Sequence, residues 1–258
     1  HSIARRQRQM CIRDRIRSGL LDAGRPSERA TSDVSILGND EHRAVARQAV
    51  RESLVLLRND ENVLPLAPGL NVMVAGSGAD SMQQQTGGWT LNWQGTGNSN
   101  EEFLTGETIF SGISTAMSDI GGEAFLSEDG SYESRPDVAI VVFGEQPYAE
   151  YLGDRTDLVF EFDDGENLQL IRELKADGIP VVSVFLTGRP LWVNPHLNAS
   201  DAFVVGWLPG SEGGGVADVL VADENGDARH DFNGRLSFSW PSDGCLLYTS
   251  PSPRDRTT

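Results

Sequence analysis

The stretch "GEQPYAEYLGDR", residues 144–155, places two glutamates, a tyrosine and an Asp-Arg pair directly after the apolar run "VAIVVF". A short apolar run of this kind predicts a buried strand. Carboxylates in a shielded loop after such a strand can act as general acids and bases, because shielding raises their pKa. Glu145 and Glu150 are therefore both candidate acid/base residues. In so acidic a chain, either can equally be a solvated loop glutamate.

A second polar stretch, "QQQTGGWTLNWQGTG", residues 83–97, carries Trp89 and Trp93. Long loops inside compact domains are usually functional or disordered, and the two tryptophans favour function. Indole faces stack on the apolar face of a pyranose ring, while carboxylates handle protons and developing oxocarbenium charge. The combination of tryptophans and carboxylates therefore favours sugar chemistry.

Other chemistries have weaker support in the sequence. "GSGAD", residues 76–80, does not complete the dinucleotide-binding motif, and we interpret it as a tight turn after a strand. His42, His196 and His230 are scattered, so we expect no metal site and interpret each as a surface or capping histidine. Ser211 lacks the Gly-x-Ser-x-Gly context of a serine hydrolase. No cofactor is expected.

The composition narrows the class of protein and of partner. The chain has 258 residues, 38% of them hydrophobic, which suffices for one large domain or two small ones. No segment is apolar for long enough to cross a membrane. The formal net charge of −17 argues against nucleic acid and anionic membranes as partners, since both require a basic face.

The two ends of the chain resemble translated transposase-type sequencing adapters, in "ARRQRQMCIRDR" and "CLLYTSPSPRD". We therefore expect residues 1–15 and 245–258 to be adapter-derived and set them apart from the fold. Both cysteines, Cys11 and Cys245, fall inside these ends, so no disulfide or thiol chemistry is expected. Residues 16–40 are expected to be a remnant of an interdomain linker.

Between the ends, short β-branched runs alternate with amphipathic helical patterns. A helix is expected to begin at Asn39 or Asp40, to continue through Leu57 and to be ended by Pro65. Four buried strands are predicted at 70–76, 137–144, 180–188 and 201–210, helices at 108–117, 165–178 and 212–224, and an alternating edge strand at 234–241. This order indicates an α/β domain with a mainly parallel sheet covered on both faces. In such a sheet, function lies at the carboxyl edge of the strands.

Several motifs together resemble the second domain of glycoside hydrolase family 3, in particular the exo-β-glucanases and β-glucosidases. They are "HRAVARQAVRESLVLLRNDENVLPL", "GGWTLNWQG", "GEQPYAEYLGD", "TGRPLWV", "SDAFVVGWLPGSEGGGVADVL" and "FNGRLSFSWP". The resemblance runs in order from about Arg17 to Asp243. Each motif alone is weak, but their order and spacing are specific.

The resemblance implies an architecture and an activity. Residues 41–244 would form a six-stranded, mainly parallel (α/β)6 sandwich, preceded in the whole enzyme by a (β/α)8-type barrel. The barrel, absent from this chain, would carry an aspartate nucleophile, and the active site would lie in the cleft between the two domains. The whole enzyme would be a retaining hydrolase acting on a β-glucan or β-glucoside in the periplasm or outside the cell. The chain alone would be inactive.

The family motif "G-E-x-P-Y-x-E" implies that Glu150, not Glu145, is the acid/base residue. The tryptophan of "W-Q-G", Trp93, resembles the platform that grips the sugar on the leaving-group side. Trp89 matches a tryptophan of the same loop whose role is less defined. The alternative is a non-catalytic carbohydrate-binding domain with the same fold, which would have no need of Glu150.

Supporting roles are expected for the residues around Glu150. Tyr148 is expected to anchor the loop, and Asp154 and Arg155 to form either an ion pair or a plain surface pair. Arg189 in "TGRP" either faces the cleft or holds the sheet edge. Ser211 is expected to cap a helix with Glu212 in its first turn.

Overall fold

The structure is a computed structural model that describes residues 11–25, 34–162 and 164–244. The chain divides into two units, His1–His42 and Arg43–Thr258. In the first unit, η1 (Val34–Ile36) is a short 3-10 helix, and no side chain described in residues 11–25 or 35–42 is buried. These stretches therefore build no core of their own. Of the ends expected to be adapter-derived, residues 1–10 and 245–258 lie outside the described part of the chain.

The second unit is built around a six-stranded sheet with the order β1-β6-β5-β4-β2-β3. Its strands are β1 (Val55–Asn59), β2 (Asn71–Ala75), β3 (Glu123–Leu126), β4 (Val138–Gly144), β5 (Val181–Leu186) and β6 (Ala202–Trp207). All neighbouring strands run parallel except β1, which is antiparallel to β6. The predicted mainly parallel α/β sheet is confirmed.

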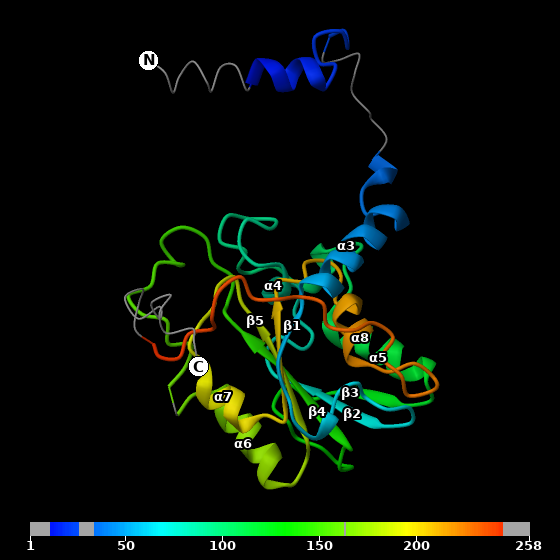
Figure 1. Cartoon of the computed structure of the whole chain (residues 1–258), viewed down its shortest axis with the longest axis vertical. Helices are drawn as coiled ribbons and strands as arrows, with labels where there is room; N and C mark the ends of the chain where they lie inside the picture. Colours follow the sequence, from blue (N-terminus) through cyan, green and yellow to red (C-terminus); the bar gives the residue numbers. More distant parts are fainter. Residues whose placement is uncertain (1–10, 26–33, 163, 245–258) are drawn as a thin grey trace, which may run out of the picture. The chain divides into compact units, whose positions relative to one another are not determined.

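Helices cover both faces of the sheet (Figure 1). α3 (Asp40–Ser53), α5 (Ile109–Asp119) and α8 (Gly214–Leu220) supply buried residues to one core, and α6 (Glu166–Ala176) and α7 (Asn194–Ala199) pack on the other. The loops contain α4 (Met82–Thr86), η2 (Asp60–Asn62) and η3 (Asn100–Glu102). The result is the predicted three-layer sandwich.

The central strand β4 shows why the apolar runs predict strands so well. Ile140 and Val142 pack into the core with α5 and α8, while Val141 and Phe143 pack into the core with α6. Both faces are buried, so the strand is continuously apolar instead of alternating. Full burial of a side chain such as Phe143 contributes about 2–3 kcal/mol to stability.

The helix that begins near Asn39 ends earlier than the sequence predicts. The Asn39 side chain accepts a hydrogen bond from the His42 backbone N–H at 2.9 Å, so the predicted cap is confirmed. α3 nevertheless ends at Ser53, and β1 follows in place of a further helical turn. Leu54 and Leu56 pack on one core and Val55 and Leu57 on the other, which is the alternation of a strand.

The edge strand predicted at residues 234–241 is also wrong, because this segment is irregular. β1 and β3 occupy the two edges of the sheet instead. Leu236 and Trp240 of the segment pack on the second core, whereas Phe238 is exposed. The alternating pattern therefore arises because every second side chain packs on the domain, and not because the segment pairs with a strand.

The chain connections diverge between the neighbouring strands β2 and β4. β2 leads through α5 to β3 on one side, and β4 leads through α6 to β5 on the other. Ligands of open α/β sheets bind at such a switch point, outside the carboxyl ends of the strands. Gly76 after β2 and Gly144 at the end of β4 mark this place.

Candidate active site

Two loops meet at the carboxyl edge of the sheet: the tryptophan loop, residues 87–99, and the glutamate loop, residues 145–155. Their backbones pack so closely that a Cβ atom at Gly88 would lie 1.9 Å from the carbonyl oxygen of Tyr148. Only glycine permits this approach. Gly88, directly before Trp89, therefore lets the two loops lie against each other.

The tip of the glutamate loop carries Glu150 among exposed aromatic rings. The indole Nε1 of Trp93 donates a hydrogen bond to Glu150 Oε2 at 2.6 Å. The Trp93 ring lies edge-on to Tyr151 at 5.9 Å and 6.4 Å from Trp89, measured between ring centroids. Trp89, Trp93 and Tyr151 are 70%, 45% and 75% exposed. We call these three residues the aromatic cluster.

Glu150 itself is exposed, and its pKa is lowered from the ordinary value. The main cause is the hydrogen bond from Trp93, which stabilises the carboxylate form. A general acid needs the opposite shift, which burial in a low-dielectric site produces. In the chain alone, Glu150 is therefore positioned but ionised.

The backbone near Glu150 adopts conformations that residues other than glycine rarely take. Trp89, Leu91 and Tyr151 have positive φ angles of 59°, 59° and 74°. Each such residue costs about 1–2 kcal/mol. Strain of this kind persists only where surrounding contacts hold it, and it concentrates at functional sites.

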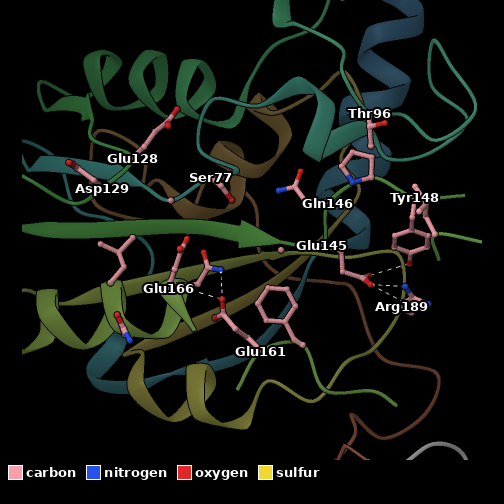
Figure 2. Close-up of a pocket in the computed structure, with 18 of the residues that line it drawn as sticks. Ser77, Thr96, Glu128, Asp129, Glu145, Gln146, Tyr148, Glu161, Glu166 and Arg189 are labelled. Carbon is pink, nitrogen blue, oxygen red and sulfur yellow. Dashed lines mark hydrogen bonds and ion pairs between the residues drawn. The ribbon is translucent and has the colours of Figure 1, made fainter. Parts of the chain in front are cut away.

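The base of the glutamate loop is held by Glu145, whose carboxylate points toward Tyr148 and Arg189 (Figure 2). Its carboxylate accepts hydrogen bonds from Tyr148 Oη at 3.1 Å, Thr187 Oγ1 at 2.7 Å and Arg189 Nε at 2.9 Å. Arg189 also donates through Nη1 to the Gly153 carbonyl at 2.5 Å, and its guanidinium lies 4.2 Å over the Tyr148 ring. Arg189 thus joins the two ends of the loop.

The environment of Tyr148 follows from this anchor. Burial and the neighbouring negative charge of Glu145 raise the pKa of Tyr148 to about 12. The phenol therefore stays protonated and donates to Glu145 throughout the physiological pH range. Arg189 thus holds the edge of the sheet, which is one of the two positions considered for it, and it also lines the cavity of about 970 Å³ described below.

Arg155 pairs with Asp157 and not with Asp154, so the ion pair that was one of the two alternatives for Asp154 and Arg155 is not formed. Its guanidinium forms an ion pair with Asp157 at 3.5 Å and donates to the carbonyl of Val159. Among the ion pairs of the described residues there is none between Asp154 and Arg155. The turn after Gly153 carries Arg155 toward the segment that follows, away from its sequence neighbour.

The predicted cap at Ser211 is also wrong. α8 begins at Gly214 with Gly213 as its N-cap, and Ser211 bonds the side chain of Glu212 at 3.1 Å. Glu212 lies before the helix, buried, in an ion pair with Arg43 at 3.0 Å. Glu212 therefore forms an ion pair with an arginine of α3 and does not lie in the first turn of α8.

His196 is not the surface or capping histidine that the sequence suggested. It lies in α7 and is fully buried, with its ring stacked on that of Phe143 at 5.3 Å between ring centroids. Its Nε2 lies 2.8 Å from Glu161 Oε2. The residue therefore belongs to the packing of the second core.

The prediction of a tight turn at residues 76–80 is confirmed. The Gly78 N–H donates to the Val142 carbonyl at 3.0 Å, and the Ala79 N–H donates to the Gly76 carbonyl at 3.1 Å. At Gly76, φ is +87°, and a Cβ atom would lie 2.4 Å from the Val142 carbonyl oxygen. The backbone N–H groups of Gly76, Gly78 and Ala79 are therefore already bonded within the protein and not available to a phosphate.

A cavity of about 970 Å³ lies behind the glutamate loop, between the ends of β2 and β4 and the side of α6 (Figure 2). Carboxylates line much of it, among them Glu128, Asp129, Glu166 and Glu173. Glu150 is not one of its lining residues. In residues 11–25, 34–162 and 164–244, no group of three His, Cys, Asp or Glu side chains is placed to hold a metal ion.

Three further residues contact the site although the sequence did not indicate them. Tyr151 packs on Trp93, Thr187 donates to Glu145, and Gln94 bonds the backbone of the glutamate loop. Gln94, Tyr151 and Thr187 all lie inside the quoted motifs, so their position was the only signal. Thr187 follows β5 and reaches Glu145 through the fold alone.

Comparison with known proteins identifies the domain. The profile of the Glycosyl hydrolase family 3 C-terminal domain matches residues 54–256. The lysosomal beta glucosidase of Dictyostelium discoideum is 33% identical over 228 residues, covering 81% of this chain and 27% of that protein. The periplasmic beta-glucosidase of Salmonella typhimurium is 30% identical, covering 78% of this chain and 28% of that protein. The chain thus spans little more than a quarter of these relatives.

Solved structures give the same result. The exo-1,3/1,4-beta-glucanase of a Pseudoalteromonas species matches with a TM-score of 0.80 and 54% identity, covering 85% of this chain and 27% of that chain. The beta-glucosidase of Listeria innocua matches with a TM-score of 0.60 and 26% identity, covering 76% of this chain and 27% of that chain. No helix in the described ranges is long and apolar enough to cross a membrane. The chain belongs to glycosyl hydrolase family 3, and residues 54–256 carry its C-terminal domain.

Proposed function

We propose that this chain supplies half of the active site of a retaining β-glucosidase or exo-β-glucanase. Glu150 is the acid/base residue, and Trp93 is the platform for the sugar on the leaving-group side. An N-terminal barrel, absent from this chain, supplies the aspartate nucleophile and the rest of the cleft. The observation that carries the proposal is the exposed Glu150 carboxylate, held at 2.6 Å by the indole of Trp93.

The geometry suits the two steps of a retaining hydrolase. In the first step, the nucleophile attacks the anomeric carbon while Glu150 gives its proton to the departing glycosidic oxygen. In the second step, Glu150 takes a proton from water, and the resulting hydroxide displaces the nucleophile. The indole N–H of Trp93 orients one carboxylate oxygen of Glu150, and the Trp93 face remains available for stacking on the leaving sugar.

On this proposal, the second domain must also change the protonation state of the exposed Glu150 carboxylate. An exposed carboxylate with a strong donor is ionised at neutral pH and has no proton to give. A barrel that covers the tip of the loop removes water from Glu150, and the loss of solvation raises its pKa toward the range of a general acid. The isolated chain is therefore inactive, and closure of the cleft assembles the site.

We place the whole enzyme in the periplasm or outside the cell. Its substrate would be a β-glucan or a β-glucoside, the class that the names of the relatives give. One of those relatives is itself called periplasmic. Polymeric glucans do not enter cells intact, so an enzyme that shortens them must meet them outside the cytoplasm.

Replacement of Glu150 in the full-length enzyme tests the proposal. Glu150→Gly should lower kcat/KM about 10²–10⁴-fold for glucosides with poor leaving groups, and much less for activated aryl glucosides. Added azide should restore part of the rate with the activated substrates, because it attacks the glycosyl-enzyme without needing a base. Equal losses on both substrate classes, or a larger substrate-selective loss from Glu145→Gly, would exclude Glu150 as the acid/base.

The exposed aromatic cluster favours one alternative, a domain that binds carbohydrate without catalysis. In that case Trp93→Ala should abolish binding of a β-glucan oligosaccharide to the chain, while Glu150→Gln leaves binding unchanged. The full-length protein would then hydrolyse neither class of glucoside. Calorimetry of the chain and a rate measurement on the full-length protein separate the two functions.

A further inference from the structure

We propose that Gln94 is a positioning residue that holds the backbone of Glu150 in the geometry required for acid/base catalysis. The inference rests on the proposed role of Glu150. The Gln94 Oε1 accepts a hydrogen bond from the Ala149 backbone N–H at 2.7 Å. The Gln94 Nε2 donates to the Glu150 carbonyl oxygen at 3.0 Å.

A primary amide is the side chain that this pair of contacts requires. It donates and accepts at the same time, in one plane, and so matches the N–H of one residue and the C=O of the next. A carboxylate has no donor for the Glu150 carbonyl, and an apolar side chain of equal length has neither partner. Gln94 pairs with the loop as a neighbouring strand would, although neither loop is a strand.

Gln94 and its neighbour Trp93 grip the same glutamate from two sides. Trp93 bonds the carboxylate of Glu150, and Gln94 bonds its main chain. Tyr151, the next residue, has a φ of 74°. A loop with such a strained residue keeps its shape only where outside contacts hold it. The two bonds from Gln94 are such contacts, and they act on the residue adjacent to the strain.

Loss of the Gln94 contacts would make the position of the Glu150 carboxylate less precise. If the Glu150 backbone relaxes, its carboxylate moves relative to the glycosidic oxygen, and a displacement near 1 Å costs on the order of 10²-fold in rate. We therefore expect Gln94→Met in the full-length enzyme to lower kcat about 10–100-fold for glucosides with poor leaving groups. Activated aryl glucosides should lose less, and KM should change little, because the sugar platform remains.

A spectroscopic readout in the chain itself tests the same claim without the barrel. The indole N–H resonance of Trp93 reports the ionisation of Glu150, because the two groups are hydrogen-bonded. In the unaltered chain, its pH titration should have a midpoint below the ordinary range of glutamate. In Gln94→Met, we expect the midpoint to rise to the ordinary range and the indole proton to exchange faster with water. Gln48→Met is the matched control, because it makes the same change on the exposed face of α3, where the side chain of Gln48 bonds Glu52. It should leave the titration midpoint of the Trp93 indole and its exchange rate with water unchanged.

The possible results separate this inference from the proposed function. A Trp93 titration that is the same in Gln94→Met as in the unaltered chain overturns the positioning role, whatever the activity of Glu150→Gly. A uniform loss on both substrate classes, accompanied by a lower Tm, also overturns it, because a merely structural residue behaves in that way. If Glu150→Gly shows no selectivity while Gln94→Met shifts the titration, the proposed function fails and Gln94 still positions Glu150.

Discussion

The two glutamates of the glutamate loop have opposite environments. Glu145, at the base, has only 7% of its side chain exposed and accepts hydrogen bonds from Tyr148, Thr187 and Arg189. Glu150, at the tip, is exposed, and its main side-chain donor is Trp93. The carboxylate of Glu145 is committed to protein partners, whereas that of Glu150 keeps acceptor sites for a substrate.

This contrast shows how a loop can be held rigidly at its base while the carboxylate at its tip stays accessible to solvent. Bonds at the base, from Arg189 to Glu145 and to Gly153, fix both ends of the loop. The tip then needs few contacts of its own to stay in place. A carboxylate that held the loop and also transferred protons would lose its ion pair each time it was protonated, so the proposed function assigns the two tasks to different residues.

Replacing Glu145 and Glu150 one at a time should give the largest difference in the free energy of unfolding. Glu145→Ala leaves Arg189 partly buried without its carboxylate, and we expect the free energy of unfolding to fall by about 3 kcal/mol. Glu150→Ala removes an exposed side chain and should leave that free energy nearly unchanged. Urea unfolding of the chain measures both. Equal costs would show that the base of the loop is not an anchor.

Acid unfolding extends the comparison to Asp218, a carboxylate buried between helices. Burial raises the pKa of Asp218, but hydrogen bonds from Arg47 at 2.8 Å and Arg51 at 2.9 Å outweigh it, and the pKa lies below the ordinary value. The folded state therefore binds this proton less readily than the unfolded chain. The resulting stability is complete above the unfolded pKa of about 3.9 and is lost as the pH falls through the lower folded value.

We expect Asp218→Asn to lower the free energy of unfolding at pH 7 by about 1–3 kcal/mol, because the amide removes the carboxylate that the Arg47 and Arg51 guanidinium groups share. The variant should also lose stability less steeply than the unaltered chain below about pH 4. Urea unfolding at a series of pH values measures both effects. A pH dependence identical to that of the unaltered chain would contradict the ion pairs.

The smallest expected effect concerns the tip. Trp93→Phe keeps an aromatic ring but removes the N–H that bonds Glu150, so the pKa of Glu150 should rise toward its ordinary value. A carboxyl ¹³C titration of the chain measures the change. Trp207→Phe is the matched control, because that indole bonds the Ser53 carbonyl instead. If both variants leave the Glu150 titration as it was, the bond from Trp93 does not set the lowered pKa.

Much of the fold was predictable, and the two strands that the sequence did not predict, β1 and β3, were missed for different reasons. β4 and β5 are buried on both faces, so their continuous apolar runs identify them. β1 was missed because Val50, Leu54 and Leu57 also fit a helical period. Only the sheet, which offers β6 as a partner, makes the chain change from helix to strand after Ser53. β3 is short and partly exposed, so no run marks it.

The candidate site was predictable in part for a related reason. The sequence by itself determined that carboxylates and tryptophans follow buried strands, because the apolar residues of a strand show that it is buried. It left Glu145 and Glu150 as equal candidates on their own chemistry. Only the tertiary structure decided which of them is sealed and which is open. The groups that decide it, Thr187 and Arg189 after β5 and Trp93 after β2, come from other strands, and no local pattern records a partner so distant along the chain.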